Sequence, residues 1–166
     1  MNNHELLRDV AELGQLLVDK GWTFACAESC TGGLLAAAMT TLPGSSAWFD
    51  RGLVTYSNAA KIQLLGVNGE TLERFGAVSE ETAMEMAAGV LDAAPDAFIS
   101  ISTTGIAGPD GATPGKPVGM VCFGFSQRAA QGVVTRALTK VFEGDRNQIR
   151  ATSVAFALQT AVAQLR

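Results

Sequence analysis

The chain has 166 residues, of which 48% are hydrophobic and 17% charged, a composition typical of a globular protein and not of a disordered one. The length predicts a single domain that spans residues 1–166. A net charge of −4 with no block of Lys and Arg argues against nucleic-acid binding, and without a run of about 18 apolar residues no membrane span is expected.

The first half of the chain is expected to alternate between helices and strands. Apolar residues at helical spacing predict a first helix, which Asn2 and Glu5 would cap and Gly21 would end. Four elements are predicted after it, in this order: a buried strand at Trp22–Glu28, a helix from Thr31 or Gly32 to Leu42, a strand at Phe49–Tyr56, and a helix from about Asn58 to Leu65.

The second half of the chain predicts a helix capped by Ser79, then a central strand at Ala97–Ser102 and a long irregular stretch at 103–119. A hairpin with strands at 120–126 and 132–142 is expected next, followed by a last helix opened by Gly144, Asp145 and Arg146. Alternating helices and strands followed by a hairpin predict an α/β fold. We expect a single layered domain with a mixed, mostly parallel sheet, a C-terminal hairpin, and helices packed on the faces.

The stretch Ala27–Ala36, AESCTGGLLA, places reactive and polar side chains where a strand is expected to give way to a helix. Ser29 would lie at this boundary, and Gly32 and Gly33 leave the backbone open there. Because the first N–H groups of a helix lack internal acceptors, such a boundary attracts a phosphate, a carboxylate or a developing oxyanion. Ser29 is therefore either a nucleophile above an anion site or, with Thr31, a simple helix cap.

A serine nucleophile needs a base, and the one histidine, His4, lies ahead of the first predicted strand. A Ser-His-Asp triad would have to recruit it from a helix end, and no His/Cys cluster has the spacing of zinc ligands. A lysine with a lowered pKa is the alternative, and Lys61 follows Tyr56 just after a predicted strand. Ligands gather at such strand ends in α/β sheets, but the same spacing fits a packing role for Tyr56 and a surface charge on Lys61.

Three other features leave alternatives open. The glycine-rich stretch 103–119 offers backbone donors to a ligand but lacks the Walker A pattern. Arg146 would either grip a phosphate or form a surface ion pair with Asp145 or Glu143. Cys30 is either a rival nucleophile or a small buried hydrophobe.

Six motifs occur in one order along the chain: AESCTGG, SSAWFDRGLVTYSNAAK, GAVSEETA, TGIAGPDG, KPVGMV and GDRNQIR. Through them the chain resembles the CinA C-terminal domain family, in its single-domain form, over about residues 5–165. The resemblance implies an amidase that hydrolyses the carboxamide of nicotinamide mononucleotide (NMN) to nicotinate mononucleotide and ammonia. The segment PDGAT departs from many relatives, which have more glycine, and Ala112 is expected to shift the loop without altering the chemistry.

The resemblance also implies roles for individual residues. It makes Ser29 the nucleophile, with Lys61 and Tyr56 as the base system that takes and relays its proton. It implies no metal and no organic cofactor. The residues expected to meet the substrate, its oxyanion or its phosphate are Glu28, Cys30, Thr31, Gly32, Gly33, Thr104, Gly105 and Arg146.

Other functions fit the same pattern. A non-catalytic domain would bind a nucleotide or an anion through the same glycines, and an amidase for another small carboxamide would use the same site. An oligomeric scaffold that contacts DNA is disfavoured by the acidic charge. From the resemblance, the expected partner is NMN. No nucleic-acid or membrane partner is expected, and formation of a homo-oligomer is left open.

The cysteine pattern bears on location. Cys26, Cys30 and Cys122 form no C-x-x-C pair, and the N-terminal residues lack the pattern of a signal peptide. We therefore expect reduced thiols and a cytoplasmic protein.

Overall fold

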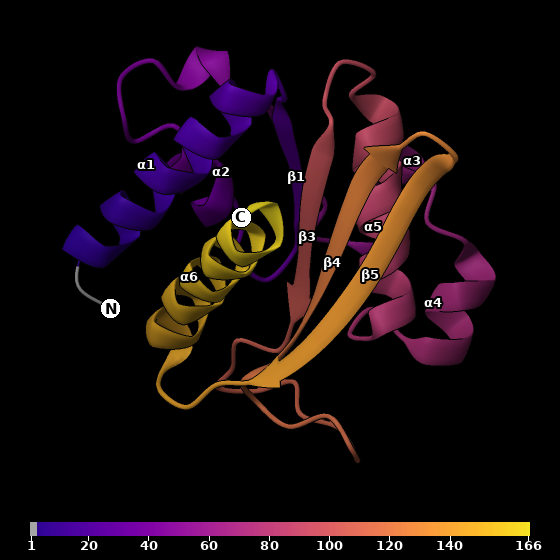
Figure 1. The fold of residues 1–166 in the computed structure, drawn as a ribbon. Coiled ribbons are helices and arrows are strands. Elements are labelled where there is room, and N and C mark those ends of the chain that lie inside the picture. Colours follow the sequence, from indigo (N-terminus) through magenta and orange to yellow (C-terminus); the bar gives the residue numbers. More distant parts are fainter. Residues whose placement is uncertain (1–2) are drawn as a thin grey trace.

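The computed structural model describes residues 3–166, which form an open five-stranded sheet (Figure 1). The strands are β1 (Phe24–Glu28), β2 (Phe49–Val54), β3 (Ile99–Gly105), β4 (Met120–Ala129) and β5 (Gly132–Val141), in the spatial order β2-β1-β3-β4-β5. β1 pairs parallel with β2 and β3, whereas β3–β4 and β4–β5 are antiparallel pairs. Four of the five strands therefore run in one direction, which confirms the predicted sheet and its C-terminal hairpin.

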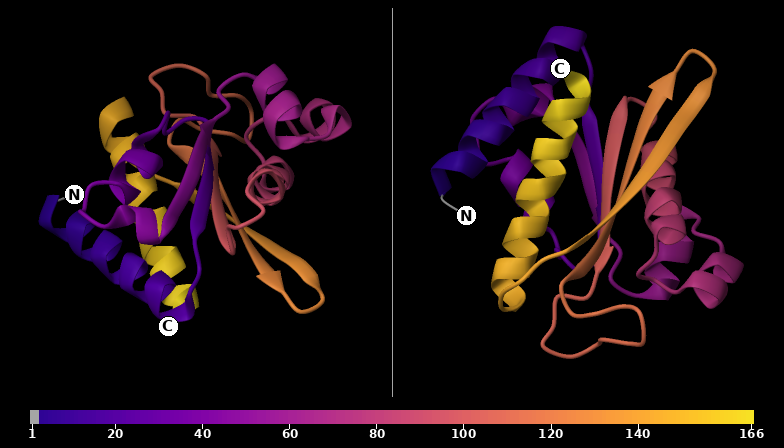
Figure 2. Two further views of the ribbon diagram at one scale, coloured as in Figure 1. Left: turned by 90° about the horizontal axis from the view of Figure 1, so that it is seen from above. Right: turned by 60° about the horizontal axis from the view of Figure 1, so that its bottom comes forward.

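Six α-helices formed by residues 3–166 cover both faces of the sheet (Figures 1 and 2). They are α1 (Asn3–Lys20), α2 (Leu34–Met39), α3 (Asn58–Leu65), α4 (Gly69–Phe75), α5 (Glu80–Ala93) and α6 (Arg146–Leu165). α1, α2 and α6 pack together on one face, and α5 covers the other face with α3 and α4 beside it. Among the described residues, no helix is at once long and apolar enough to cross a membrane.

Side chains that alternate along the strands build a separate core on each face. Phe24 of β1 packs into the core beneath α1 and α6, and the next residue, Ala25, packs into the core beneath α5. The α5 face carries small residues: Ser102 donates to the Ala83 carbonyl at 2.6 Å, and a Cβ on Gly124 would overlap that same carbonyl. α5 therefore lies unusually close to the sheet.

Two helices differ from the prediction. α2 begins at Leu34 and not at Thr31 or Gly32, because Gly32 and Gly33 have positive φ angles of 60° and 100° and form a turn ahead of the helix. α4 has no counterpart in the prediction, because its seven residues are too few to show an apolar period, although Asn68 caps it.

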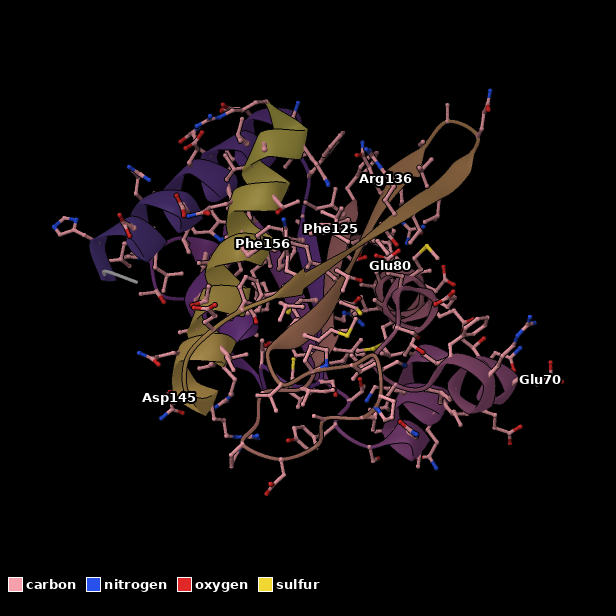
Figure 3. The ribbon with its side chains drawn as sticks, turned by 90° about the horizontal axis from the view of Figure 1, so that it is seen from below. Glu70, Glu80, Phe125, Arg136, Asp145 and Phe156 are labelled. Atoms are coloured by element: carbon pink, nitrogen blue, oxygen red, sulfur yellow. The ribbon has the colours of Figure 1, made fainter. Side chains whose placement is uncertain are left out.

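The hairpin is longer than predicted. β4 and β5 pair up to Ala129 and Gly132, which leaves a two-residue turn in place of the predicted connection at 127–131. The residues of that stretch have low strand propensity, but pairing with the β-branched start of β5 overrides it. α6 begins as predicted, next to Asp145 (Figure 3). Asp145 is its N-cap and forms a capping box with Gln148. Asn2 of the first predicted cap lies outside the described residues.

Candidate active site

Ser29 follows β1 directly, at the carboxyl end of the parallel part of the sheet. Its backbone N–H donates to the Thr103 carbonyl of β3 at 2.9 Å. On the other side, the N–H of Thr55, which follows β2, donates to the Glu28 carbonyl at 2.8 Å. Ser29 is thus fastened between the ends of three strands, the place where α/β sheets bind ligands.

Lys61 reaches the Ser29 hydroxyl from α3, a helix that Ser57 caps. The lysine side chain is almost fully buried, with 1% of the residue exposed. Its Nζ lies 3.1 Å from Ser29 Oγ and donates to the carbonyl oxygens of Thr55 and Tyr56 at 2.8 and 3.2 Å. The alternative that Lys61 is a solvated surface charge is therefore wrong.

The surroundings of Lys61 make its neutral form easier to reach than it is in water. Burial lowers the pKa of Lys61 from its usual value of 10.5, and the nearby Cys30 opposes this shift. Within residues 3–166, the structure gives Lys61 no carboxylate at salt-bridge distance. Nζ donates to two carbonyl oxygens and to the Ser29 hydroxyl, and a neutral amine in the same place could instead accept from that hydroxyl through its lone pair.

Glu28 lies beneath this site and not at its surface. The residue is fully buried, and its carboxylate accepts hydrogen bonds from the N–H groups of Leu35 and Ala36 at 2.9 and 3.0 Å and from the Thr31 hydroxyl at 2.6 Å. The Thr31 hydroxyl also bonds that of Thr103, at 2.7 Å. This corrects two expectations: Glu28 has no free face for substrate, and the first N–H groups of α2 already have an acceptor.

The turn between Ser29 and α2 offers the backbone donors instead. The Gly32 N–H donates to the Ser29 carbonyl at 3.1 Å. In the part of the chain that the structure describes, the N–H groups of Thr31 and Gly33 donate to no backbone or side-chain acceptor. Gly33 is partly exposed, so its N–H is available to an oxyanion or another negatively charged group, whereas Thr31 is fully buried.

Cys30 is unsuited to be the nucleophile. Its side chain is buried, and burial raises the pKa of the thiol to about 12. The reactive form of cysteine is the thiolate, so Cys30 stays protonated and unreactive near neutral pH.

Tyr56 and Arg146 form the exposed rim of the site. Tyr56 is 60% exposed, and its hydroxyl accepts a hydrogen bond from Arg146 Nη2 at 3.1 Å. Arg146 Nη1 donates to the Gly108 carbonyl at 2.8 Å, which joins α6 to the glycine-rich loop. The backbone carbonyl of Tyr56, not its hydroxyl, contacts Lys61. Among the described residues Arg146 has no ion pair with Asp145 or Glu143.

Thr104 and Gly105 were expected in the irregular stretch after the central strand, but they belong to the strand itself, because β3 continues to Gly105. The Thr104 hydroxyl donates to the Ala77 carbonyl at 2.6 Å. A Cβ on Gly105 would lie 2.6 Å from the Met120 carbonyl oxygen of the paired strand. Both residues therefore fasten the sheet rather than offer open donors to a substrate.

Arg150 also lies near the site, and the sequence motifs do not identify it. From α6 its Nε donates to the Cys30 carbonyl at 3.1 Å and its Nη2 to the Thr31 carbonyl at 3.0 Å. The available signal is its spacing: Arg150 stands four residues after Arg146, so both lie on one helix face.

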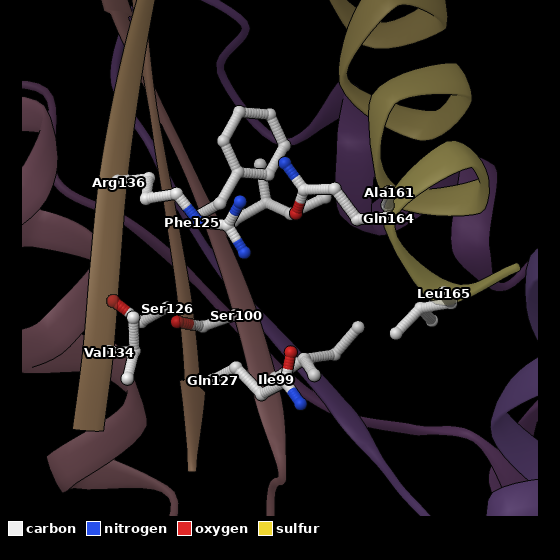
Figure 4. Close-up of a pocket in the computed structure, with 11 residues that line it drawn as sticks. Ile99, Ser100, Phe125, Ser126, Gln127, Val134, Arg136, Ala161, Gln164 and Leu165 are labelled. Carbon is white, nitrogen blue, oxygen red and sulfur yellow. The ribbon is translucent and has the colours of Figure 1, made fainter. Parts of the chain in front are cut away.

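Two other features lie away from this chemistry. A hollow between β4, β5 and the end of α6 is lined by residues such as Phe125, Arg136 and Leu165 (Figure 4). Its volume of about 30 Å³ is far below the roughly 300–1,000 Å³ of small-molecule pockets, so it does not fit a nucleotide. Within residues 3–166, no group of three or more His, Cys, Asp or Glu is placed to hold a metal ion.

Comparison with known proteins relates this site to a family. The chain is 54% identical over 159 residues to a nicotinamide-nucleotide amidohydrolase PncC of Enterobacter agglomerans, covering 96% of this chain and 93% of that protein. It is 49% identical over 160 residues to the protein of the same name from Escherichia coli K12, covering 96% and 94% of the two chains.

The fold of this chain is also similar to that of a solved structure. The crystal structure of a competence or damage-inducible protein from Enterobacter asburiae superposes with a TM-score of 0.91 at 40% identity, covering 97% of this chain and 98% of that one. The family model described as the CinA C-terminal domain matches residues 8–165. The chain therefore belongs to the CinA C-terminal domain family.

Proposed function

We propose that this protein hydrolyses the carboxamide of NMN, with Ser29 as the nucleophile and Lys61 as its base. The observation that carries the proposal is the 3.1 Å contact between Lys61 Nζ and Ser29 Oγ, in a buried setting that lowers the pKa of the amine. The choice of NMN is supported by the name of the relatives from Enterobacter agglomerans and Escherichia coli.

In the first half of the reaction, Lys61 takes the proton of the Ser29 hydroxyl while Oγ attacks the carboxamide carbon. The carbonyl oxygen becomes an oxyanion, which the free N–H group of Gly33 would stabilise. As the carbon–nitrogen bond breaks, the ammonium group of Lys61 returns the proton to the leaving nitrogen, and ammonia departs. Ser29 is left as an ester of nicotinate mononucleotide.

In the second half, water replaces ammonia. Lys61 takes a proton from this water, the resulting hydroxide attacks the ester carbon, and the proton passes to Ser29 Oγ as the ester bond breaks. Nicotinate mononucleotide is released and the enzyme is regenerated. In this proposal Tyr56 and Arg146, which are joined by a hydrogen bond at the rim, would meet the outer part of the substrate, and the arginine would supply the charge that a phosphate needs.

The test is to incubate the purified protein with NMN and to measure ammonia and nicotinate mononucleotide together. We expect the two products in equal amounts, and hydroxylamine added to the reaction should divert part of the product to the hydroxamate. If NMN raises the melting temperature without being hydrolysed, the site binds nucleotides without catalysis. Hydrolysis of other small carboxamides but not of NMN would show that the reaction class is right and the substrate wrong.

A further inference from the structure

A row of three hydroxyl side chains crosses the carboxyl ends of the parallel strands. Ser29 follows β1, Thr55 follows β2, and Thr104 lies near the end of β3. The strand register places Ser29 between the two threonines. Side chains at such neighbouring positions point to the same face of a sheet, and here that is the face on which α3 brings Lys61 to Ser29.

The three hydroxyls differ in their partners. Thr104 Oγ1 donates to the Ala77 carbonyl at 2.6 Å, and Ser29 Oγ contacts Lys61 Nζ. Thr55 is fully buried, yet its hydroxyl has no hydrogen-bond partner among residues 3–166. Within the part of the chain that the structure describes, it is the one buried side-chain nitrogen or oxygen in this condition. Because burying a polar group without a partner destabilises a protein, this hydroxyl requires an explanation.

The proposed reaction supplies a partner for it. In the resting site Nζ donates to the carbonyls of Thr55 and Tyr56 at 2.8 and 3.2 Å, which uses both hydrogens of a neutral amine. When Lys61 takes the proton of Ser29, Nζ gains a third N–H, while Ser29 Oγ becomes bonded to the substrate carbon and is a weaker acceptor. Thr55 Oγ1 has free lone pairs and belongs to the residue whose carbonyl already holds Nζ.

We propose that Thr55 is a positioning residue whose hydroxyl accepts a hydrogen bond from the protonated Lys61 before Lys61 returns its proton to the leaving nitrogen. This inference rests on the proposed amidase chemistry. The bond is absent in the resting structure and forms when Lys61 becomes charged, so it lowers the barrier without tightening the binding of substrate. Loss of the hydroxyl should therefore reduce kcat and leave KM nearly unchanged.

The test compares Thr55→Val, which keeps the shape of the side chain and removes its hydroxyl, with Thr82→Val. Thr82 is also fully buried, but its hydroxyl donates to the Gly76 carbonyl at 2.8 Å. Thr55→Val should lower kcat for NMN about 10- to 100-fold, the strength of a hydrogen bond to a charged group, with KM within about threefold of wild type. Its melting temperature should equal or exceed that of wild type, because no hydrogen bond of the resting protein is lost.

The two variants should thus differ in opposite ways. Thr82→Val should melt at a lower temperature than wild type and keep the wild-type kcat at a temperature where it is folded. Thr55→Ser retains the hydroxyl and should keep most of kcat, whereas Thr55→Ala should lose as much as Thr55→Val.

Three results would overturn the proposal. The first is a wild-type kcat in Thr55→Val. The second is a Thr55→Val protein that fails to fold or melts as far below wild type as Thr82→Val does, since the hydroxyl would then support the fold. The third is an equal loss of kcat in Thr55→Ser and Thr55→Val.

A second readout does not depend on NMN. When a fluorophosphonate labels the protein, Ser29 Oγ bonds to phosphorus and displaces fluoride while Lys61 takes the serine proton, so Thr55→Val should slow labelling as it slows kcat. If wild type is labelled but leaves NMN intact, the proposed substrate is wrong while the labelling rates still test Thr55. Wild type that neither turns over NMN nor reacts at Ser29 would contradict both the proposed function and this inference.

Discussion

At the scale of single residues, Lys61 decides how the site responds to pH. Its amine meets two carbonyl oxygens and the Ser29 hydroxyl inside the protein, and burial lowers its pKa from 10.5. Because only the neutral amine can take the serine proton, kcat/KM for NMN should rise with pH along a limb centred below 10.5. The measurement is kcat/KM from pH 5 to the alkaline limit of folding. A rate independent of pH over this range would exclude Lys61 as the base.

The same shift has a consequence for stability, opposite in sign to that of a salt-bridged lysine. The folded-state pKa is lower than the unfolded one, so the unfolded chain binds more protons between the two values. The cost of holding Lys61 in the core is full below its folded pKa and disappears as pH rises to 10.5. Lys61→Met should therefore be more stable than wild type at low pH, with the difference shrinking towards alkaline pH in denaturant titrations.

Arg146 tests whether the rim recognises the phosphate. Among residues 3–166, its guanidinium has hydrogen bonds only to the Tyr56 hydroxyl and the Gly108 carbonyl and no salt bridge, so its charge remains available to an anion. Arg146→Met should raise KM for NMN about 10- to 100-fold, the worth of a charge-assisted hydrogen bond. With nicotinamide riboside, which lacks the phosphate, the variant and wild type should differ little. Equal losses on both substrates would mean that Arg146 acts on the ring or on Tyr56 instead.

At the scale of elements, the start of α2 depends on the buried Glu28 carboxylate. It accepts from Leu35 and Ala36 and from the Thr31 hydroxyl, all inside the protein. Glu28→Gln keeps the shape but turns an amide group toward these donors, and it should lower the free energy of unfolding by about 1–3 kcal/mol. Urea denaturation measures this loss. A variant as stable as wild type would show that the carboxylate is not needed to cap the helix.

The packing of α5 against α3 fixes where Lys61 stands. A Cβ on Gly89 of α5 would overlap the carbonyl of Leu65, the last residue of α3, so one helix has to move. Gly89→Ala should cost roughly 1–3 kcal/mol of stability and, because α3 carries Lys61, lower kcat as well. Gly69→Ala is the matched control, since nothing lies within 4 Å of its Cβ position and its φ is not positive. Similar stability and activity in both variants would contradict this coupling.

At the scale of the whole molecule, local patterns predict the sheet and the place of Ser29 well. Alternating apolar runs indicate the strands, and the polar boundary after Glu28 marks the end of the sheet where the candidate site lies. Contacts between distant segments are not visible in such patterns. Nothing in the sequence near Lys61 shows that it is buried, because its side chain reaches Ser29, which lies in a distant segment. The spacing of Arg150 places it on the same helix face as Arg146, but its contact with Cys30, 120 positions away, cannot be predicted from that spacing.

The motifs predict the wrong position for some side chains, because these residues stabilise the fold and do not face the substrate. Glu28 stands beside Ser29 in sequence, yet it lies beneath the turn because the N–H groups at the start of α2 need an acceptor. Thr104 and Gly105 belong to β3 and pack against neighbouring backbone. Adjacency in a motif therefore predicts the neighbourhood of the nucleophile but not which groups face the substrate.

The most direct test of the central claim is ammonia release from NMN by wild type and by Ser29→Ala, measured side by side with a chelator present. Loss of the nucleophile should lower kcat by on the order of 10⁴- to 10⁶-fold, while NMN still protects the variant against heat. Ammonia release at the wild-type rate by Ser29→Ala would contradict the account and remove Ser29 from the mechanism.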